Sequence, residues 1–250
     1  MNIVIFDTET TSLEKPFCYN IGYVIYDTEA DKTLKTADFV VEQVWHNPML
    51  FTTAYYANKR DIYIGAMRSR KTVMDKFGYI CQQMIRDFKA FEVSAAFAFN
   101  SSFDEKVFNF NCDWFKCNNP FDNVSIYDIR GYAHHFICDD KYKSWCEEYE
   151  RFSESGNYST TAENVYQFVS GNYDFVEEHT ALSDSIIEAE ILKYAIFKGA
   201  EVGTDYKAKK SIERKKTLTF TVKWNGEEIL KEECESIRYM KKNNTIILKG

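Results

Sequence analysis

Two carboxylates, two residues apart, end the first apolar run of the chain. The run Ile3 to Phe6 is typical of a strand, and Asp7 and Glu9 follow it directly. Because side chains alternate between the two faces of a strand, both carboxylates project from the same face. Two anions held this close repel each other unless a cation lies between them, and their oxygens suit Mg²⁺ or Mn²⁺. The commoner meaning of such a pair is the start of a solvated loop, because acids are mostly exposed.

Two further acids and a histidine lie at the beginnings of predicted helices. Asp104 is in the first turn of its helix, where the helix dipole alone stabilises an acid. Asp184 lies one helical step before Ile187, so it extends the inward-facing apolar stripe of its helix and needs a cation or donors. His179 precedes the same helix, and an imidazole beside metal ions can take a proton from water. The conjunction of four acids on three elements with one histidine predicts a metal-dependent hydrolytic site.

The elements that must position these residues alternate between strands and helices. Apolar and β-branched runs predict strands at 3–6, 18–26, 33–45, 93–99 and 124–127, the first three as an antiparallel meander. Apolar periodicity predicts helices at 70–91, 102–110, 161–169 and 184–197, and a further helix that follows the 124–127 strand and runs through His135. Ser102 and Glu105 form a capping-box pattern, Gly171 ends a helix, and residues 139–158 are expected to be an insertion. This order predicts an α/β fold with a mixed sheet between helices.

The pattern changes beyond Gly203. A basic connector, Lys207 to Lys216, leads to a strand with strict apolar alternation at 218–224, and Asn225-Gly226 then gives a strong hairpin signal. A third strand is expected at 245–248. We therefore expect a main domain at residues 1–204 and a basic linker with a small antiparallel β appendage at residues 205–250. An appendage of this size needs support from the main domain or from a partner.

Composition and charge set limits on the class of protein. The chain has 250 residues, of which 45% are hydrophobic, with only 10 Gly and 3 Pro, so it can build a sizeable core. No run approaches the roughly 18 apolar residues of a membrane helix, and no signal segment precedes Asp7, so we expect a soluble cytoplasmic protein. The net charge of −7 divides into −12 for residues 1–204 and +5 for residues 205–250.

A second basic zone lies within the acidic part of the chain. Residues 52–90 carry eight Lys and Arg against three acids. Two basic zones in an acidic protein could guide a polyanion towards an acidic centre, although a solvated helix face is the commoner meaning of such a run.

The seven cysteines favour reduced thiols, because they are odd in number and no secretory signal accompanies them. One group could hold zinc instead, although its spacings match no compact zinc-finger pattern. It consists of Cys112, Cys117, His134, His135 and Cys138. Core or surface thiols are the commoner meaning.

Three segments resemble the motifs of a known family. IVIFDTETT at Ile3 to Thr11, AFNSSFDEKVF at Ala98 to Phe108, and HTALSD at His179 to Asp184 are similar to the three motifs of DEDDh 3′–5′ exonucleases. That family includes proofreading subunits of bacterial replicative polymerases and ribonuclease T. The order and spacing agree from Met1 to about Lys198, and the His-x4-Asp spacing separates this branch from relatives that use Tyr. The resemblance implies a ribonuclease H-like fold with a mixed five-stranded sheet flanked by helices.

The resemblance also assigns roles to residues. It implies that Asp7, Glu9, Asp104 and Asp184 bind two Mg²⁺ or Mn²⁺ ions and that His179 is the general base. It places five further residues against the terminal nucleotide: Thr8, Thr10, Leu13, Asn100 and Phe103. Leu13 and Phe103 could equally be core residues. Ser12 replaces a Gly of many relatives and Phe99 replaces a His, which puts the details of the nucleotide pocket in doubt.

These observations predict a metal-dependent 3′–5′ exonuclease that releases nucleoside monophosphates from single-stranded nucleic acid, with DNA favoured as substrate. An RNA-trimming or oligoribonucleotide-degrading enzyme with the same site is the alternative, because recognition of the 2′-OH depends on few contacts. A non-catalytic nucleic-acid-binding module is a third interpretation, against which the intact acids and His179 count. The expected partners are single-stranded 3′ ends and, for the appendage, a polymerase or a second copy of the chain, with no membrane.

Overall fold

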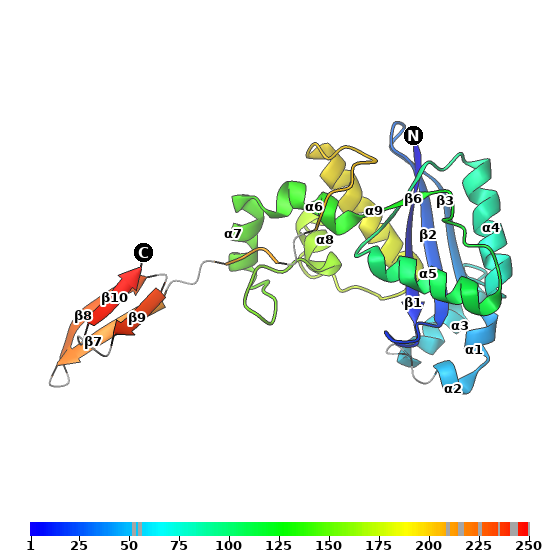
Figure 1. Ribbon diagram of the computed structural model, residues 1–250. Helices are drawn as coiled ribbons and strands as arrows, with labels where there is room; N and C mark the ends of the chain where they lie inside the picture. Colours follow the sequence, from blue (N-terminus) through cyan, green and yellow to red (C-terminus); the bar gives the residue numbers. More distant parts are fainter. Residues whose placement is uncertain are drawn as a thin grey trace.

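The structure is a computed structural model, and it describes residues 1–51, 54, 57–208, 211–214, 218–224, 227–234, 236–240 and 245–249 (Figure 1). Within these ranges a six-stranded sheet has the order β4-β3-β2-β1-β5-β6. Its strands are β1 (Asn2–Thr10), β2 (Cys18–Asp27), β3 (Lys32–Val41), β4 (Val73–Asp75), β5 (Ala95–Ala98) and β6 (Ser125–Asp128). No helix of the described residues is long and apolar enough to cross a membrane.

The sheet is mixed, as the sequence predicts. Strands β1, β2 and β3 form the antiparallel meander, whereas β5 runs parallel to β1 and β6 runs parallel to β5. The expected α/β fold class is confirmed, with six strands instead of five because the short β4 pairs parallel with β3. Strand β1 thus lies inside the sheet, between β2 and β5. The residues that follow its apolar run lie at the carboxyl end of this inner strand.

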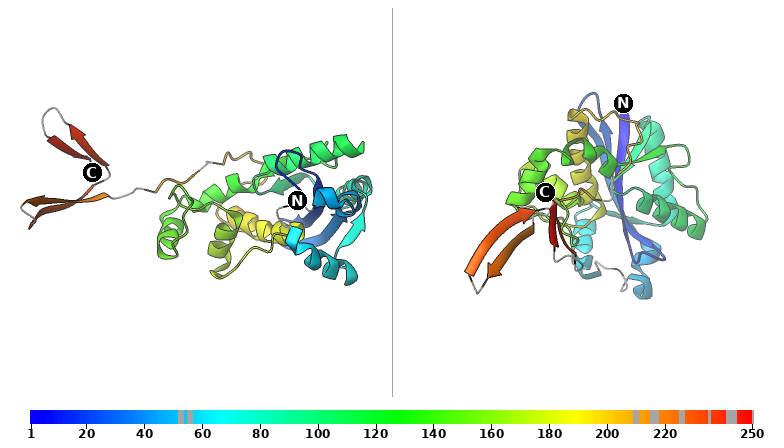
Figure 2. Two further views of the ribbon diagram at one scale, coloured as in Figure 1. Left: turned by 90° about the horizontal axis from the view of Figure 1, so that it is seen from below. Right: turned by 60° about the vertical axis from the view of Figure 1, so that its left-hand side comes forward.

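Helices cover both faces of the sheet (Figures 1 and 2). Helices α4 (Phe77–Ala90) and α5 (Ser102–Phe115) pack on one face, where they share a core with Val4 and Phe6 of β1. Helices α6 (Ile129–Ile137), α8 (Ala162–Ser170) and α9 (Ala181–Phe197) build the core of the other face with Ile3 and Ile5. Since β1 alternates between these two cores, Asp7 and Glu9 project to the face covered by α9.

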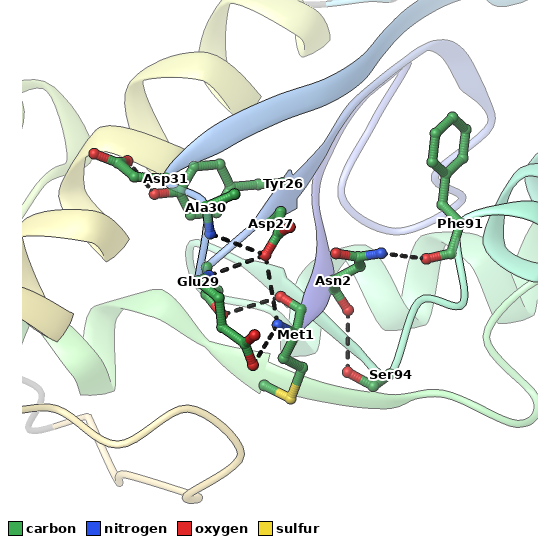
Figure 3. A network of polar contacts seen from close by, with 10 residues as sticks. Met1, Asn2, Tyr26, Asp27, Glu29, Ala30, Asp31, Phe91 and Ser94 are labelled. Atoms are coloured by element: carbon green, nitrogen blue, oxygen red, sulfur yellow. Dashed lines mark hydrogen bonds and ion pairs between the residues drawn. The ribbon is translucent and has the colours of Figure 1, made fainter.

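A network of hydrogen bonds fixes the opposite end of β1 (Figure 3). The amide of Asn2 donates to the carbonyl of Phe91 at 2.6 Å, and the hydroxyl of Ser94 donates to the carbonyl of Asn2 at 3.0 Å. These bonds join the first strand to the turn that enters β5. The same pairing aligns Ile3 with Ala95, so the register that carries Asp7 to the other edge is set here.

Three helix predictions differ from the structure. Residues 70–76 do not belong to a helix, because Val73 is exposed and its strand β4 pairs with β3, so only α4 remains of the predicted 70–91 helix. The predicted capping box is wrong, since α5 has Ser101 as its N-cap and no side-chain cap bond. The expected insertion contains helix α7 (Asp140–Glu148). By contrast, α8 ends at Gly171 in the left-handed conformation, as predicted.

Between β3 and β4 the chain forms short helices that the sequence pattern did not predict, and the first of them replaces the end of the strand predicted at 33–45. They are α1 (Glu42–Trp45), α2 (Pro48–Phe51), η1 (Ala57–Lys59) and α3 (Arg60–Arg68). Trp45, Phe51 and Tyr63 pack together as an aromatic cluster beside Tyr19 of β2. This segment brings Lys59 close enough to the end of β1 for its charge to act on Glu9.

The C-terminal strands are antiparallel, as expected. Strand β7 (Leu218–Trp224) pairs with β8 (Glu227–Cys234), and β9 (Ser236–Met240) pairs with β10 (Thr245–Lys249). The predicted Asn225-Gly226 turn lies outside the described residues. The segment before them packs on the main domain, since Ile212 is buried and its carbonyl accepts a hydrogen bond from the N–H of Tyr158 at 3.1 Å. The division into residues 1–204 and 205–250 stays a prediction.

Candidate active site

The start of α9 is held tightly against β2, beside the end of β1. A side chain at Gly22 would place its Cβ 2.1 Å from the backbone nitrogen of Leu182, so only glycine permits this close approach. The N–H of Ala181 donates to Oδ1 of Asn20 at 2.8 Å, and the hydroxyl of Ser185 donates to the carbonyl of Gly22 at 3.1 Å. These interactions bring Asp184 to the face of β1 that carries Asp7 and Glu9.

Three of the predicted acids form a compact group. One carboxylate oxygen each of Asp7, Glu9 and Asp184 lies within 4.8 Å of the others. Asp184 is only 6% exposed, and its Oδ1 has no hydrogen-bond partner among the described residues. A buried, unpaired carboxylate oxygen is costly unless a cation or a donor satisfies it. The donor set therefore fits a divalent cation with hard oxygen ligands.

Asp104 joins this group from the opposite side of β1. It lies in the first turn of α5, is 2% exposed, and its Oδ1 accepts a 2.6 Å hydrogen bond from the hydroxyl of Thr8. Burial raises the pKa of Asp104 to about 7. Burial, and then the charge of Asp104, raise the pKa of Asp7 well above its ordinary value. The two carboxylates therefore share one electrostatic environment, although Asp104 is not part of the 4.8 Å group.

Burial and the charges of neighbouring acids raise the pKa values of this group. Burial raises the pKa of Glu9 to about 8 and that of Asp184 to about 9, and in each case acidic neighbours add to the rise. Such shifts mean that the protein alone supplies too little positive charge for all these acids to ionise near neutral pH. A bound divalent cation would supply that charge and reverse the shifts.

His179 lies at the mouth of this group, in the loop before α9. One ring nitrogen lies within 4.8 Å of carboxylate oxygens of Glu177 and Asp184, and its Nδ1 is 3.5 Å from Oε2 of Glu177. The residue adopts a left-handed backbone conformation with φ of 53°, an uncommon state for a residue other than glycine. Burial, and then the charge of Lys59, lower the pKa of His179. The ring is therefore neutral at neutral pH and can accept a proton.

Three residues near the site were not predicted from the sequence. Glu188 is 3% exposed, and its Oε2 accepts a 3.2 Å hydrogen bond from the N–H of Phe99. A signal for it exists, because Glu188 lies one helical step after Asp184 on the inward face. Burial raises the pKa of Glu177 to about 7. Lys59 lowers the pKa of Glu9 and Asp184 by its charge and donates to the carbonyl of Glu178, an interaction that no local pattern predicts.

The residues that the resemblance placed against the nucleotide have different environments. The Thr8 hydroxyl is engaged by Asp104, and the Thr10 hydroxyl donates to the carbonyl of Ser12 at 3.4 Å. Leu13 is 73% exposed, whereas Phe103 packs against the core. Asn100 is exposed, has φ of 63°, and its N–H donates to Oδ1 of Asp128 at 2.9 Å. Their nucleotide-binding role stays a prediction.

The structure does not bring the five predicted zinc ligands together. Cys112 belongs to the core under α4 and α5, whereas Cys138 packs against the core on the other face of the sheet. Within α6 and its C-cap, Nδ1 of His134 lies 3.2 Å from Sγ of Cys138. The ring of His135 packs on Tyr206 with the centroids 4.6 Å apart. The hypothesis that Cys112, Cys117, His134, His135 and Cys138 form one zinc site is therefore wrong, because the sheet separates the two halves of the set.

Two adjoining grooves lie along β3. The first, of about 470 Å³, is lined by Glu178 and Thr180 beside His179 and reaches Asp38 and Lys71. The second, of about 600 Å³, shares Asp38 and Lys71 with the first. Its basic lining residues are Lys35, Arg70, Lys71 and Arg86. Part of the predicted basic zone thus lines grooves that extend to Glu178 and Thr180, the two neighbours of His179 in the chain.

Solved structures share this fold. Neither the scan of protein-family models nor the search of curated proteins gives a match. The nuclease domain of 3′hExo, a DEDDh family member bound to rAMP, is 16% identical with a TM-score of 0.54, covering 84% of this chain and 97% of that one. A 3′-exonuclease in a structure of 3′-end recognition of the histone mRNA stem-loop is 14% identical with a TM-score of 0.54, covering 79% and 82%. The chain therefore has the fold of a DEDDh nuclease domain, and the expected ribonuclease H-like class is confirmed.

Proposed function

We propose that the protein is a metal-dependent 3′–5′ exonuclease that hydrolyses terminal phosphodiester bonds of single-stranded nucleic acid and releases nucleoside monophosphates. The observation that carries the proposal is the group of Asp7, Glu9 and Asp184 beside His179, in which one buried oxygen has no hydrogen-bond partner among the described residues. A fold shared with DEDDh nuclease domains supports the same reaction class.

The acids would hold the cations that the reaction needs. Asp7, Glu9 and Asp184 offer oxygens within 4.8 Å of one another, and Asp104 adds a fourth carboxylate across β1. Two Mg²⁺ or Mn²⁺ ions, when bound, neutralise charge on the phosphate and make water a better nucleophile. Without them, a phosphate could not approach a cluster of carboxylates, because like charges repel.

His179 would take the proton from the attacking water. Its lowered pKa keeps the ring neutral, and the neutral ring has one nitrogen able to accept a proton. Glu177 lies 3.5 Å from Nδ1, so we assign the N–H to Nδ1 and the accepting lone pair to Nε2. Once protonated, the imidazolium gains the nearby charge of Glu177, which stabilises the product of the transfer.

DNA is the favoured substrate, and RNA is the second candidate. RNA is supported by the fold neighbours, whose structures concern rAMP and a histone mRNA stem-loop. Apolar contact with the exposed Leu13 and charge in the basic grooves do not depend on the 2′-OH, so these features would accept either polymer. A polymerase or a second copy of the chain stays the proposed partner of the appendage.

A direct assay tests the proposal and separates its alternatives. Single-stranded DNA and RNA of identical sequence, labelled at the 5′ end, are incubated with the full chain and Mg²⁺ or Mn²⁺, with chelator as control. We expect a ladder that shortens from the 3′ end and stops on chelation, and the faster of the two polymers identifies the substrate. Retention of both strands at full length, with strand binding intact, would show a non-catalytic binding module instead.

A further inference from the structure

Three cysteines far apart in the sequence converge where α4 meets α5. Cys81 lies on α4, Cys112 lies on α5, and Cys117 follows the end of α5. Their three sulfur atoms all lie within 4.8 Å of one another. From the sequence, Cys112 and Cys117 are grouped with the histidines of α6. In the structure their neighbour is the thiol of Cys81 instead.

The backbone after α5 places the third sulfur in this group. Lys116 caps the helix in the left-handed conformation with φ of 54°, an uncommon state for a residue with a side chain. This turn lets the N–H of Cys117 donate to the carbonyl of Cys112 at 3.1 Å. Gly78 of α4 faces it, since a Cβ at Gly78 would lie 3.4 Å from Cβ of Cys117. Cys117 is therefore within ordinary van der Waals reach of α4.

The spacing of the sulfurs suits a soft metal ion. Zinc binds thiolate sulfur at about 2.3 Å, so two ligands of a tetrahedral site lie about 3.8 Å apart. A group already within 4.8 Å reaches that spacing through small side-chain rotations. Thiolates prefer zinc over the Mg²⁺ and Mn²⁺ that suit the carboxylates, so the two groups of ligands would select different metals.

The cysteine cluster is open to solvent on the side of Cys117. Cys81 and Cys112 are 1% and 6% exposed, whereas Cys117 is partly exposed. An ion would therefore enter past Cys117, and water would complete its coordination from the same side, as in zinc sites with three protein ligands.

We propose that Cys81, Cys112 and Cys117 bind one Zn²⁺ ion as three thiolates, with water in the fourth position. Each thiol releases its proton to solvent on binding, and the complex carries one net negative charge that the open side hydrates. The ion would tie α4 to α5, whose first turn carries Asp104. This proposal is independent of the exonuclease proposal, because it concerns a different cluster and a different metal.

Cobalt substitution tests the site by a signal that the acidic centre cannot give. Co²⁺ is added to the fully reduced full-length protein without oxygen, and near-ultraviolet absorption is recorded. Thiolate ligands produce intense charge-transfer absorption with Co²⁺, whereas carboxylates do not. We expect one equivalent of Co²⁺ to saturate this absorption and one equivalent of Zn²⁺ to abolish it.

Two serine variants provide the contrast. Cys117→Ser removes the partly exposed ligand and should weaken Co²⁺ binding at least tenfold, since removing even a residue that only supports a metal ligand costs about 10- to 100-fold. Cys138→Ser alters another partly exposed thiol, outside the cluster, and should bind like the parent. Circular dichroism establishes that both variants fold.

Three results would overturn the site. The first is no charge-transfer absorption with the reduced parent protein, and the second is absorption that survives unchanged in Cys117→Ser. The third is an equal loss in Cys117→Ser and Cys138→Ser. If the reduced parent binds no cobalt and forms a disulfide between two of the three cysteines in air, the cluster is a thiol pair and not a metal site.

Discussion

The chain carries two clusters of potential metal ligands, and they differ in what their burial costs. The carboxylates at the end of β1 are held close together with raised pKa values, and Asp184 keeps a buried oxygen unpaired among the described residues. Two of the thiols between α4 and α5 are buried just as deeply, yet a neutral cysteine behaves as a small apolar side chain. The acid cluster is therefore unstable without positive charge, whereas the thiol cluster is stable with or without it.

This difference separates two kinds of evidence for a metal site. For the acids, energetics alone calls for a cation, because burial of several like charges is tolerated only where they are neutralised. For the thiols, only the short distances between the three sulfur atoms indicate a metal ion. A change that removes an acid of this group should therefore lower activity and raise the stability of the metal-free protein. A change that removes one of the thiols should not have this pair of effects.

The largest effect is expected from Asp184→Asn. The amide keeps the shape and loses the charge that would hold a cation, and a loss of several kcal/mol of transition-state stabilisation corresponds to a rate about 10³-fold lower. The same change removes a carboxyl whose pKa burial raises to about 9. The metal-free variant no longer bears the cost of keeping this group protonated in the folded state, so at neutral pH it should melt at a higher temperature than the parent. Initial rates of strand shortening and thermal melting in chelator measure the two effects.

Asp140→Asn is the matched control, because Asp140 is fully exposed on α7. The rate should not change in this variant, and the melting temperature should change only by the small contribution of the exposed Asp140–Lys143 ion pair and of the helix dipole. An Asp184→Asn protein that is both inactive and less stable than the parent would show that the carboxylate is a structural residue.

His179→Ala should lower the turnover rate by about 10²-fold or more, the usual contribution of a general base. Cation binding should persist, because the acids remain, and calorimetric titration with Mn²⁺ measures it. His46→Ala changes an exposed histidine that follows α1 and should leave both quantities unaltered. Equal rates for His179→Ala and the parent would remove the imidazole from the mechanism.

The sequence predicted the parts of the site that depend on local pattern. Asp7 and Glu9 share a face because β1 is a strand, and Asp184 points inward because it continues the stripe of Ile187, so alternation and helical periodicity were sufficient. The other five strands of the main sheet followed from the same patterns. Strand β4 did not, because its three residues pair with β3 at the sheet edge and none of them is buried.

The parts that the sequence did not reveal depend on distant segments meeting in the fold. Lys59 reaches Glu178 across 119 positions, and Cys81 meets Cys112 through the packing of two helices. The zinc hypothesis failed for the same reason, since proximity in sequence placed α6 histidines beside Cys112 although the sheet lies between them. Glu188 is the exception, because its helical spacing from Asp184 is visible in the sequence.

The basic groove should affect strand binding more weakly than the acids affect turnover. Lys71 lines both grooves, so Lys71→Glu should lower affinity for a long single strand several-fold and reduce the salt slope of binding by about 0.7 for each phosphate that is no longer neutralised. Fluorescence anisotropy at several salt concentrations measures the slope. Lys141→Glu on α7 reverses an exposed charge outside both grooves and should not change it. A dinucleotide too short to reach Lys71 should be hydrolysed at the parental rate, and a slower rate would place Lys71 in the catalytic site instead.

Stability should also depend on pH in a way that distinguishes the two clusters. In the folded chain the pKa values of Asp184, Glu9 and Asp104 are about 9, 8 and 7, whereas such carboxyls titrate near 4 when unfolded. The folded state therefore binds more protons than the unfolded state between about pH 4 and 9. It follows that the metal-free protein loses stability as pH rises through this window. Each kcal/mol of stability that is removed lowers the melting temperature by about 2–4 °C.

Added Mg²⁺ competes with those protons, so the rise in melting temperature that it causes should be larger at high pH than at low pH. Asp184→Asn should flatten the pH dependence, and Cys117→Ser should leave the Mg²⁺ effect intact while removing any rise caused by Zn²⁺. Differential scanning calorimetry of the parent and both variants, in chelator and in each metal, measures all of these quantities. A metal-free protein whose stability does not vary with pH would show that folding does not raise the pKa values of these acids. The energetic distinction between the two clusters would then disappear.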